Sequence, residues 1–291
     1  MKKITFVVLP ILMSACAGGS SSSDGSASTN AFTSWSATIS ANAPVSFTGG
    51  STSVMALDGT SVQTDSDGTA TLALGGNGIF SSINAATPTN SVSFSAAKGD
   101  TLSSGFYQTS TIALNKAETT IGVFTNPTYY GFEYQTYGAW GAYGNATTSS
   151  NAVSVGSATP VTGLPATGSY TFTGGASGYY TDPSKLAYVT NATMTATASF
   201  DSRVVNFNTT GTYISGSPAG NAIPASDLNL AGTLTIASGA NKLSGNVTTV
   251  NGMTGNANGK FYGPTANEVG GTFAVSGSGL GTFVGGFGGK R

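Results

Sequence analysis

The sequence predicts an all-β protein, because short runs that alternate apolar and polar residues recur between turn residues along most of the chain. No stretch of about a dozen residues combines helical spacing with good helix formers. Hydrophobic residues make up 39 % of the chain and aromatic residues 10 %, which is enough apolar surface for a core. Charged residues make up only 7 %, and the 42 glycines suit tight turns. We therefore expect strands joined by glycine-rich turns.

The chain begins with the features of a secretory signal. Lys2 and Lys3 form a basic start, residues 4–12 are mostly apolar, and a small-residue cleavage site follows. The apolar run is too short to span a bilayer. Met13-Ser14-Ala15-Cys16 resembles the lipobox of bacterial lipoproteins, which implies that a signal peptide of residues 1–15 is removed and that Cys16 receives acyl chains such as palmitate. The alternative is an ordinary secretory signal in which Cys16 has no role.

Cysteine usage agrees with lipidation, because Cys16 is the only cysteine of the chain. The mature protein can form no internal disulfide and has no Cys-rich metal site. Acyl chains on Cys16 would anchor the protein without a transmembrane helix. Ala17 stands where many such lipoproteins carry the aspartate that retains them at the inner membrane, so we expect an outer-membrane location. Residues 16–30 are expected to be the lipidated cysteine and a flexible Gly/Ser tether.

Residues 31–158 contain several predicted strands and one aspartate-rich turn. Asp65-Ser66-Asp67-Gly68 is expected to be a hairpin turn and not a calcium loop, because Gln63 and Leu74 stand where an EF-hand needs acidic ligands. The alternating runs predict strands at Val45–Phe47, Thr69–Leu74, Val92–Phe94, Phe106–Leu114, Thr119–Phe124 and Tyr129–Tyr137.

The second half of the chain predicts a small barrel. Ala192, Met194, Ala196, Ala198 and Phe200 fall on one face of a strand, and this mixture of small and large residues suits a barrel interior. Asp201-Ser202 is a plausible hairpin turn. Counting the runs gives about eight strands, the number at which side chains just fill a closed barrel. The runs are Ser169–Gly174, Ala192–Phe200, Val204–Phe207, Gly211–Ile214, Leu228–Ile236, Leu243–Val250, Gly259–Tyr262, Gly271–Val275 and Gly281–Phe287.

The run GKFYGPTANEVGGTF, residues 259–273, is the most specific motif of the chain. A strand is expected to end before Gly263-Pro264, because proline cannot donate to the ladder, and glycines open the next strand. On physical grounds the run is a barrel corner. We expect structural roles for Glu268, as an acceptor of backbone N–H groups in the turn, and for a solvated Lys260. The structural residues of the motif are Gly259, Phe261, Tyr262, Gly263, Pro264, Glu268, Gly270, Gly271 and Phe273.

This motif resembles the signature of the β-barrel domain of the transferrin-binding protein B family, shared with factor H binding protein-like surface lipoproteins. Residues 164–170, 198–201 and 282–288 resemble the start, the second strand and the closing strand of that barrel. The resemblance implies a C-terminal eight-stranded antiparallel barrel, residues 159–291. Residues 31–158 resemble, in character only, the strand-rich handle domain that precedes the barrel in the family.

An aromatic cluster between residues 129 and 143 holds the candidate binding residues. On a strand, Tyr130 and Phe132 would share one face, and Tyr129 and Glu133 the other. Two interpretations are open: both faces are buried between handle and barrel, or the second face is an exposed patch that anchors a partner. The candidate ligand-binding residues are Tyr129, Glu133, Tyr137, Trp140 and Tyr143.

Catalysis is limited by the absence of histidine from the sequence. The chain therefore lacks Ser-His-Asp and Cys-His nucleophile activation, most zinc sites and the usual general base near neutral pH. No spacing among the acidic residues indicates the carboxylate pair of a glycosidase. Loss of Lys2 and Lys3 with the signal would change the net charge from −1 to −3, so there is no nucleic-acid footprint. We expect neither an enzyme nor a metal site.

The family resemblance implies a lipid-anchored, surface-exposed outer-membrane protein that binds a host macromolecule, such as an iron-carrier protein or a complement regulator. It also implies an outer-membrane export partner. One alternative is a haem-acquisition lipoprotein, in which a tyrosine or methionine replaces the usual histidine ligand; otherwise no cofactor is expected. Another is an adhesin or host-colonisation factor. An integral outer-membrane barrel is disfavoured, because the second face of the 192–200 strand, with Thr193 and Thr195, is too polar for lipid.

Overall fold

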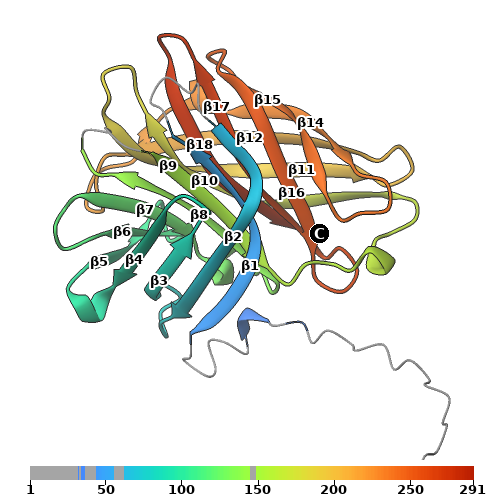
Figure 1. Ribbon diagram of the computed structural model, residues 1–291, viewed down its shortest axis with the longest axis horizontal. Coiled ribbons are helices and arrows are strands. Elements are labelled where there is room, and N and C mark those ends of the chain that lie inside the picture. Colours follow the sequence, from blue (N-terminus) through green and yellow to red (C-terminus); the bar gives the residue numbers. More distant parts are fainter. Residues whose placement is uncertain (1–31, 33, 37–43, 56–61, 145–148) are drawn as a thin grey trace, which may run out of the picture. The chain divides into compact units, whose positions relative to one another are not determined.

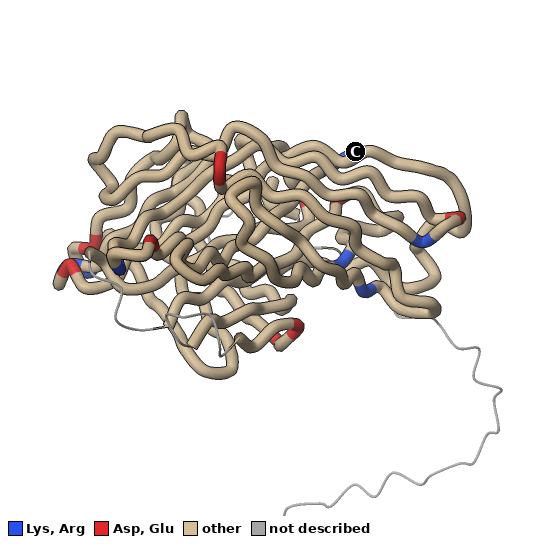
Figure 2. Tube along the Cα trace, turned by 90° about the horizontal axis from the view of Figure 1, so that it is seen from above, with Lys and Arg blue, Asp and Glu red and all other residues tan. Residues whose placement is uncertain are grey.

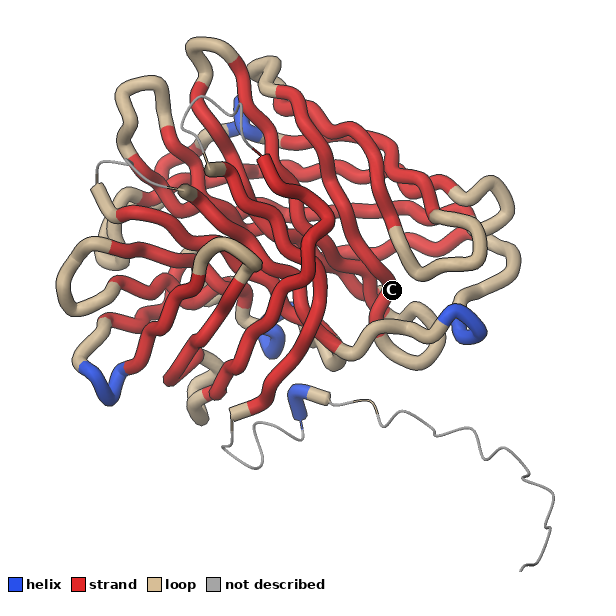
Figure 3. The backbone as a smooth tube through the Cα atoms, in the orientation of Figure 1, coloured by secondary structure: helices blue, strands red, loops and turns tan. Residues whose placement is uncertain are grey.

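The computed structural model describes residues 32, 34–36, 44–55, 62–144 and 149–291, and it contains two antiparallel β-sheets (Figure 1). The signal segment, Cys16 and the tether lie outside the described residues. Both sheets belong to one compact unit, Phe32–Arg291, so a domain boundary at residue 158 stays a prediction. None of the helices in the described part of the chain has the length and hydropathy of a membrane-spanning segment. The predicted all-β class is confirmed (Figure 3).

The N-terminal sheet has nine strands in the order β4-β3-β2-β1-β9-β8-β7-β6-β5. Its first and last strands in sequence, β1 and β9, pair at the centre, so the chain enters and leaves through the middle of the sheet. The strands are β1 (Val45–Val54), β2 (Val62–Leu74), β3 (Phe80–Ala86), β4 (Ser91–Ser95), β5 (Thr101–Gly105), β6 (Ser110–Leu114), β7 (Thr120–Thr125), β8 (Gln135–Ala142) and β9 (Ser150–Gly156).

The C-terminal sheet closes into a ring. β10 pairs with both β11 and β18, and β11 also pairs with β12, so that β10, β11, β12 and β14 to β18 form the predicted eight-stranded barrel. Short β13 (Ile223–Pro224) is added to the side of β12. The barrel strands are β10 (Ser169–Thr181), β11 (Ala187–Ser199), β12 (Val204–Ser215), β14 (Leu230–Ile236), β15 (Leu243–Thr249), β16 (Thr254–Tyr262), β17 (Glu268–Gly277) and β18 (Gly281–Lys290).

In the described part of the chain, short helical turns lie between some of the strands. The turn α2 has Pro127 at its first position and ends at Gly131, which adopts a left-handed φ of 64°. Proline suits the first helical position and glycine the residue after the last one, so these two residues define the turn. The helical turns are η1 (Ala96–Lys98), α2 (Pro127–Tyr130), η2 (Val161–Gly163) and η3 (Ser226–Leu228).

The barrel interior follows the alternation predicted for the 192–200 strand. Met194, Ala196 and Ala198 are buried in the barrel core, whereas Thr193 is exposed and Thr195 is half-buried. Side chains of a strand point alternately to opposite faces, so one register assigns every second residue to the core. The register of the β11–β12 pairing shifts between Asn191 and Thr193, but the extra residue lies on β12, so the alternation along β11 continues.

The outside of the barrel packs against the N-terminal sheet. Thr52 Oγ1 on β1 and Thr272 Oγ1 on β17 are 2.7 Å apart, and the Tyr262 hydroxyl donates to the carbonyl oxygen of Ser154 at 3.2 Å. These groups are buried, so their hydrogen bonds avoid the cost of unpaired polar atoms. The interface between the sheets is therefore well ordered and partly polar.

Glycines of β17 and β18 let the N-terminal sheet approach this closely. A Cβ atom on Gly270 would overlap Gln135 Oε1, and one on Gly288 would lie 2.5 Å from Gln135 Nε2. Gln135 also crosses the interface, since its Nε2 donates to the carbonyl oxygen of Val269 at 2.8 Å. The Gly-Gly pairs of the 259–273 motif and of the closing strand thus have a packing role beyond the barrel corner.

Glu268 is a buried acid in the same interface. It is 2 % exposed, and its carboxylate accepts the backbone N–H groups of Glu133 at 2.5 Å and Tyr134 at 3.2 Å. Burial raises the pKa of the Glu268 carboxyl to about 7, although both hydrogen bonds and Lys290 oppose the rise. The donors lie on the facing segment before β8, whereas the sequence predicts donors within the turn itself.

The predicted hairpin turn at residues 65–68 is wrong. Asp65 to Gly68 is no hairpin turn but lies inside β2, where Asp65 has a left-handed φ of 58° beside a register shift in the β1–β2 pairing. Asp65 forms an ion pair with Lys242, from the turn before β15. In Figure 2 the few charged positions lie mostly near turns.

The predicted strand Phe106–Leu114 is also too long. Phe106, Tyr107 and Gln108 have φ values of 47°, 59° and 74°, so they form a left-handed turn and β6 begins only at Ser110. Non-glycine residues rarely adopt this conformation, and three in succession are held only by strong local contacts. This turn belongs to one of the surfaces described below.

Candidate functional site

The predicted aromatic cluster does not form one strand, and its members separate in the structure. Tyr129 lies in α2, while β8 begins only at Gln135. The expected strand Tyr129–Tyr137 is therefore wrong, and Pro127 with Gly131 is the reason, because together they favour a single helical turn. Trp140 and Tyr143 border one hollow of the surface, and Tyr129 borders another.

Tyr137 and Glu133 belong to the interface with the barrel. Tyr137 is fully buried, and its Cε1 atom lies 2.7 Å from the position that a Cβ atom on Gly288 would take. Glu133 is half-buried; it donates its backbone N–H to Glu268 and accepts a hydrogen bond from Ser36 at 3.2 Å on Oε2. Neither residue lines a hollow that includes Trp140 or Tyr143.

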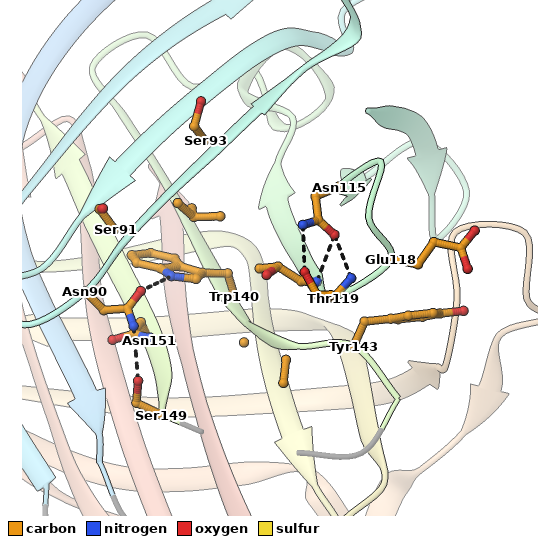
Figure 4. Close-up of a pocket in the computed structure, with 14 residues that line it drawn as sticks. Asn90, Ser91, Ser93, Asn115, Glu118, Thr119, Trp140, Tyr143, Ser149 and Asn151 are labelled. Atoms are coloured by element: carbon orange, nitrogen blue, oxygen red, sulfur yellow. Dashed lines mark hydrogen bonds between the residues drawn. The ribbon is translucent and has the colours of Figure 1, made fainter. Parts of the chain in front are cut away.

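The hollow bordered by Trp140 and Tyr143 has a volume of about 610 Å³ and is called the amide hollow below. Four segments of the N-terminal sheet meet here: the start of β4, the β6–β7 turn, the end of β8 and the start of β9 (Figure 4). Its lining comprises Asn90, Ser91, Val92, Ser93, Asn115, Glu118, Thr119, Thr120, Trp140, Gly141, Ala142, Tyr143, Ser149 and Asn151.

Hydrogen bonds hold one wall of the amide hollow in place. Trp140 is buried, stacks on Phe124 with ring centroids 6.3 Å apart, and donates its Nε1–H to Asn90 Oδ1 at 3.3 Å. Asn90 Nδ2 then donates to Ser149 Oγ at 3.2 Å (Figure 4). The Asn90 amide is therefore oriented by a rigid indole below it and a hydroxyl beside it.

Asn151 is the most deeply buried amide of the hollow. It is 0 % exposed, and its Oδ1 accepts the hydroxyl of Ser53 at 2.9 Å and that of Thr87 at 3.5 Å. Its Nδ2 has no hydrogen-bond partner among the described residues. An unpaired buried N–H donor costs free energy, so a ligand acceptor that reached Nδ2 would gain more than at an exposed amide.

The opposite side of the hollow is the β6–β7 turn. Asn115 Oδ1 accepts the backbone N–H groups of Thr119 at 2.8 Å and Thr120 at 2.9 Å, which closes the turn. Tyr143 is tied to it, because its backbone N–H donates to the carbonyl oxygen of Thr119 at 2.9 Å. Figure 4 shows the Tyr143 ring and Glu118 on the side of Trp140 away from Asn90. The backbone of Tyr143 is thus fixed, and its half-buried side chain packs against the core cluster that contains Ile121 and Tyr179.

The lining of the amide hollow is almost neutral. Among the described residues that line it, Glu118, at the exposed tip of the turn, is the only charged one, and none is a lysine or arginine. Hydroxyl and amide groups supply both donors and acceptors. Such a lining suits a neutral polar ligand and provides no positive charge for an anion.

Two exposed tyrosines, Tyr107 and Tyr129, lie on segments that Asn126 connects, and together they are called the tyrosine patch. The Tyr107 ring packs edge-on against Tyr213 of β12, with ring centroids 6.4 Å apart. Tyr107 is 79 % exposed at the left-handed turn before β6, and Tyr129 is 55 % exposed on α2. Asn126 joins the two segments: its Nδ2 donates to the carbonyl oxygen of Gln108 at 2.8 Å, and its carbonyl oxygen accepts the N–H of Tyr129 at 3.2 Å. The sequence analysis missed Tyr107, which it assigned to a regular strand.

A metal centre has no candidate here, since the described residues contain no group of three or more His, Cys, Asp or Glu side chains that could hold a metal ion. Cys16, the predicted lipidation site, lies outside these residues. The described residues therefore offer two candidate surfaces, one concave and nearly neutral, the other exposed and aromatic.

Comparison with known proteins identifies the second half of the chain. Residues 164–291 match the model of the family described as the C-lobe and N-lobe beta barrels of Tf-binding protein B. No curated protein sequence matches this chain. The matched span begins just before β10 and ends at the last residue, so it contains the whole closed barrel.

The solved structures to which this chain is similar share little of its sequence. A variant of transferrin-binding protein B from Haemophilus parasuis Hp5 has a TM-score of 0.48 and 15 % identity, over 82 % of this chain and 44 % of that one. The N-lobe of lactoferrin-binding protein B from Moraxella bovis has a TM-score of 0.36 and 13 % identity, over 84 % of this chain and 98 % of that one. The chain thus spans less than half of the first of these structures. These values are too low to say what this chain binds.

Proposed function

We propose that this chain is a surface-exposed outer-membrane lipoprotein that binds a host macromolecule through its N-terminal sheet, because residues 164–291 match the family model of the barrels of Tf-binding protein B. The family description names Tf-binding protein B, which makes an iron-carrier protein such as transferrin the first partner to test. The barrel supplies the scaffold, because its conspicuous glycines and its buried acid serve the contact between the two sheets.

The observation that carries this proposal is the tyrosine patch. Tyr107 and Tyr129 hold large rings in solvent, at 79 % and 55 % exposure, on backbone that Asn126 fixes. Aromatic residues of this kind are enriched at the centres of protein interfaces, and tyrosine loses little conformational entropy on binding. Phe106, beside Tyr107, is buried and anchors the turn from below. A preformed turn lowers the cost of binding.

Removing both rings is expected to weaken capture of the host partner. The double substitution Tyr107→Ser and Tyr129→Ser should lower the affinity for transferrin, or for the protein that the wild type retains from serum, at least about ten-fold. Surface plasmon resonance measures the change, and thermal unfolding checks that the fold is intact. Val250→Ser, at a barrel turn where Val250 is 74 % exposed, is the matched control for loss of an exposed apolar side chain. Unchanged affinity in the double variant would exclude the tyrosine patch as the binding surface.

The lipid anchor is testable separately through Cys16. We expect Cys16→Ser to abolish incorporation of labelled palmitate and to move the protein from the membrane fraction to the soluble fraction. Protease added to intact cells should digest the wild type, while the variant stays protected inside. Membrane retention of Cys16→Ser, or protection of the wild type until the cells are lysed, would contradict a lipid-anchored surface protein.

A further inference from the structure

We propose that the amide hollow of the N-terminal sheet binds a neutral saccharide. This inference does not depend on the proposed host partner, since the tyrosine patch and the amide hollow have separate linings. It depends on three properties of the hollow: an unpaired buried donor, a nearly uncharged lining of amides and hydroxyls, and an aromatic ring at its border.

The first property is the buried Nδ2 donor of Asn151 in the wall of the hollow. Asn151 is fully buried, its Oδ1 is engaged by Ser53, and its Nδ2 has no partner among the residues that the structure describes. Most buried amides in proteins are satisfied, so such a group requires an explanation. A sugar hydroxyl can pair with Nδ2 once the wall side chains that cover this atom shift, because a hydroxyl accepts a hydrogen bond and can donate its own proton onward.

The lining selects against charged ligands. A phosphate, a carboxylate or a sialic acid would meet no lysine or arginine in the hollow and would face the carboxylate of Glu118 at the rim. A purely apolar ligand would leave the amides of Asn90 and Asn151 desolvated and unpaired. Neutral polyols avoid both costs, because every hydroxyl is at once donor and acceptor.

Tyr143 provides the surface on which a pyranose ring can stack. Its half-buried ring borders the hollow, and its backbone is bonded to the β6–β7 turn. The C–H groups of one sugar face are apolar and pack on aromatic rings, while the hydroxyls at the sugar edge remain free for the amides. Trp140, in contrast, is buried and serves to orient Asn90. The volume of about 610 Å³ lies within the range of small-molecule sites, about 300–1,000 Å³.

The test uses methyl glycosides of glucose, galactose, mannose and N-acetylglucosamine with the folded mature protein. We expect at least one to give saturation-transfer signals and to change the fluorescence of Trp140, with a dissociation constant of the order of 1 mM. Trp35, the other tryptophan, packs on Phe47 in the core and contributes a constant background. Absence of any response at about 50 mM, or an equal response to sialic acid, would overturn the proposal.

Matched variants separate specific binding from a general effect of sugar. Tyr143→Ala should weaken binding at least about ten-fold, whereas Tyr143→Phe, which keeps the ring, should stay within about two-fold of the wild type. Val250→Ser, at a barrel turn outside the amide hollow, should bind like the wild type. Equal binding by Tyr143→Ala would contradict the assigned site.

The neutral saccharide that binds the amide hollow can be a free sugar or part of a glycan on a protein. Retention of a desialylated serum glycoprotein by the wild type, lost after enzymatic removal of its glycans and absent in Tyr143→Ala, would support the protein-borne source. Binding of the methyl glycosides without such retention would support a free saccharide. Failure of both would overturn the proposal, and it would leave the result for Tyr107 and Tyr129 unaffected.

Discussion

Replacing Gly270 with alanine is expected to destabilise the protein by about 3 kcal/mol, near the upper end of the usual cost of overpacking. The new Cβ atom would overlap Gln135 Oε1 and would lie 3.1 Å from the carbonyl oxygen of Phe287, so the side chain of Gln135 would have to move. Gln135 is fully buried and bonded to Val269 across the interface, and this contact would be lost with the movement. Chemical denaturation, followed by circular dichroism, measures the change.

The control for this experiment is Gly50→Ala, another glycine in a strand. No atom lies within 4 Å of the Cβ position at Gly50, so the change is expected to be below about 0.5 kcal/mol. A double-mutant cycle with Gln135→Ala adds a direct test. If the clash causes the loss, the double variant will be more stable than the sum of the single effects allows. Additive effects would show that Gly270 matters for another reason.

The stability of the protein is expected to fall as pH rises from about 4.5 to about 7, because of Glu268. Burial raises the pKa of its carboxyl from the ordinary value of 4.5 to about 7. Above pH 4.5 the unfolded chain releases this proton, while the folded protein retains it until about pH 7, so deprotonation favours unfolding across this window. A pKa rise of this size contributes about 3 kcal/mol to the free energy of unfolding. This contribution is fully present below pH 4.5 and is lost by about pH 7.

Glu268→Gln isolates this contribution. The free energy of unfolding of the wild type, relative to the variant, should decrease by about 3 kcal/mol between pH 4 and pH 8. Glu118→Gln, at an exposed turn, is the matched control for removal of one carboxylate. If the difference in unfolding free energy between the wild type and each variant depends on pH in the same way for both variants, the pH dependence does not arise at the interface between the sheets.

Sequence patterns predicted the barrel well, because its strands have one buried and one solvated face over much of their length. In β11 the alternation of alanine and methionine with threonine survives intact, and the turn at Asp201 separates it from β12. The strands of the N-terminal sheet were harder to predict from the sequence. β9 is buried along its whole length, so it shows no alternation in SNAVSVG, and the sequence analysis did not predict it.

The candidate surfaces were only partly predictable. Trp140 and Tyr143 were selected as aromatic candidates, and both border the amide hollow. Asn90 and Asn151 were not selected, because single asparagines in polar sequence carry no local signal and become informative only when the fold brings them together. Tyr107 was missed because its sequence resembles that of a strand, whereas its backbone is left-handed.

The sequence alone predicted the all-β class, the closed barrel and the resemblance of that barrel to a known family, because alternation and turn residues are local properties of the chain. Only the tertiary structure decided the purpose of the 259–273 motif and the location of the binding surfaces. Gly270 makes room for Gln135, and Glu268 accepts a hydrogen bond from Glu133. Both partners are more than a hundred residues away in the chain. Close backbone approach and the burial of polar groups depend on residues that are far apart in the sequence, so no local sequence pattern can show them.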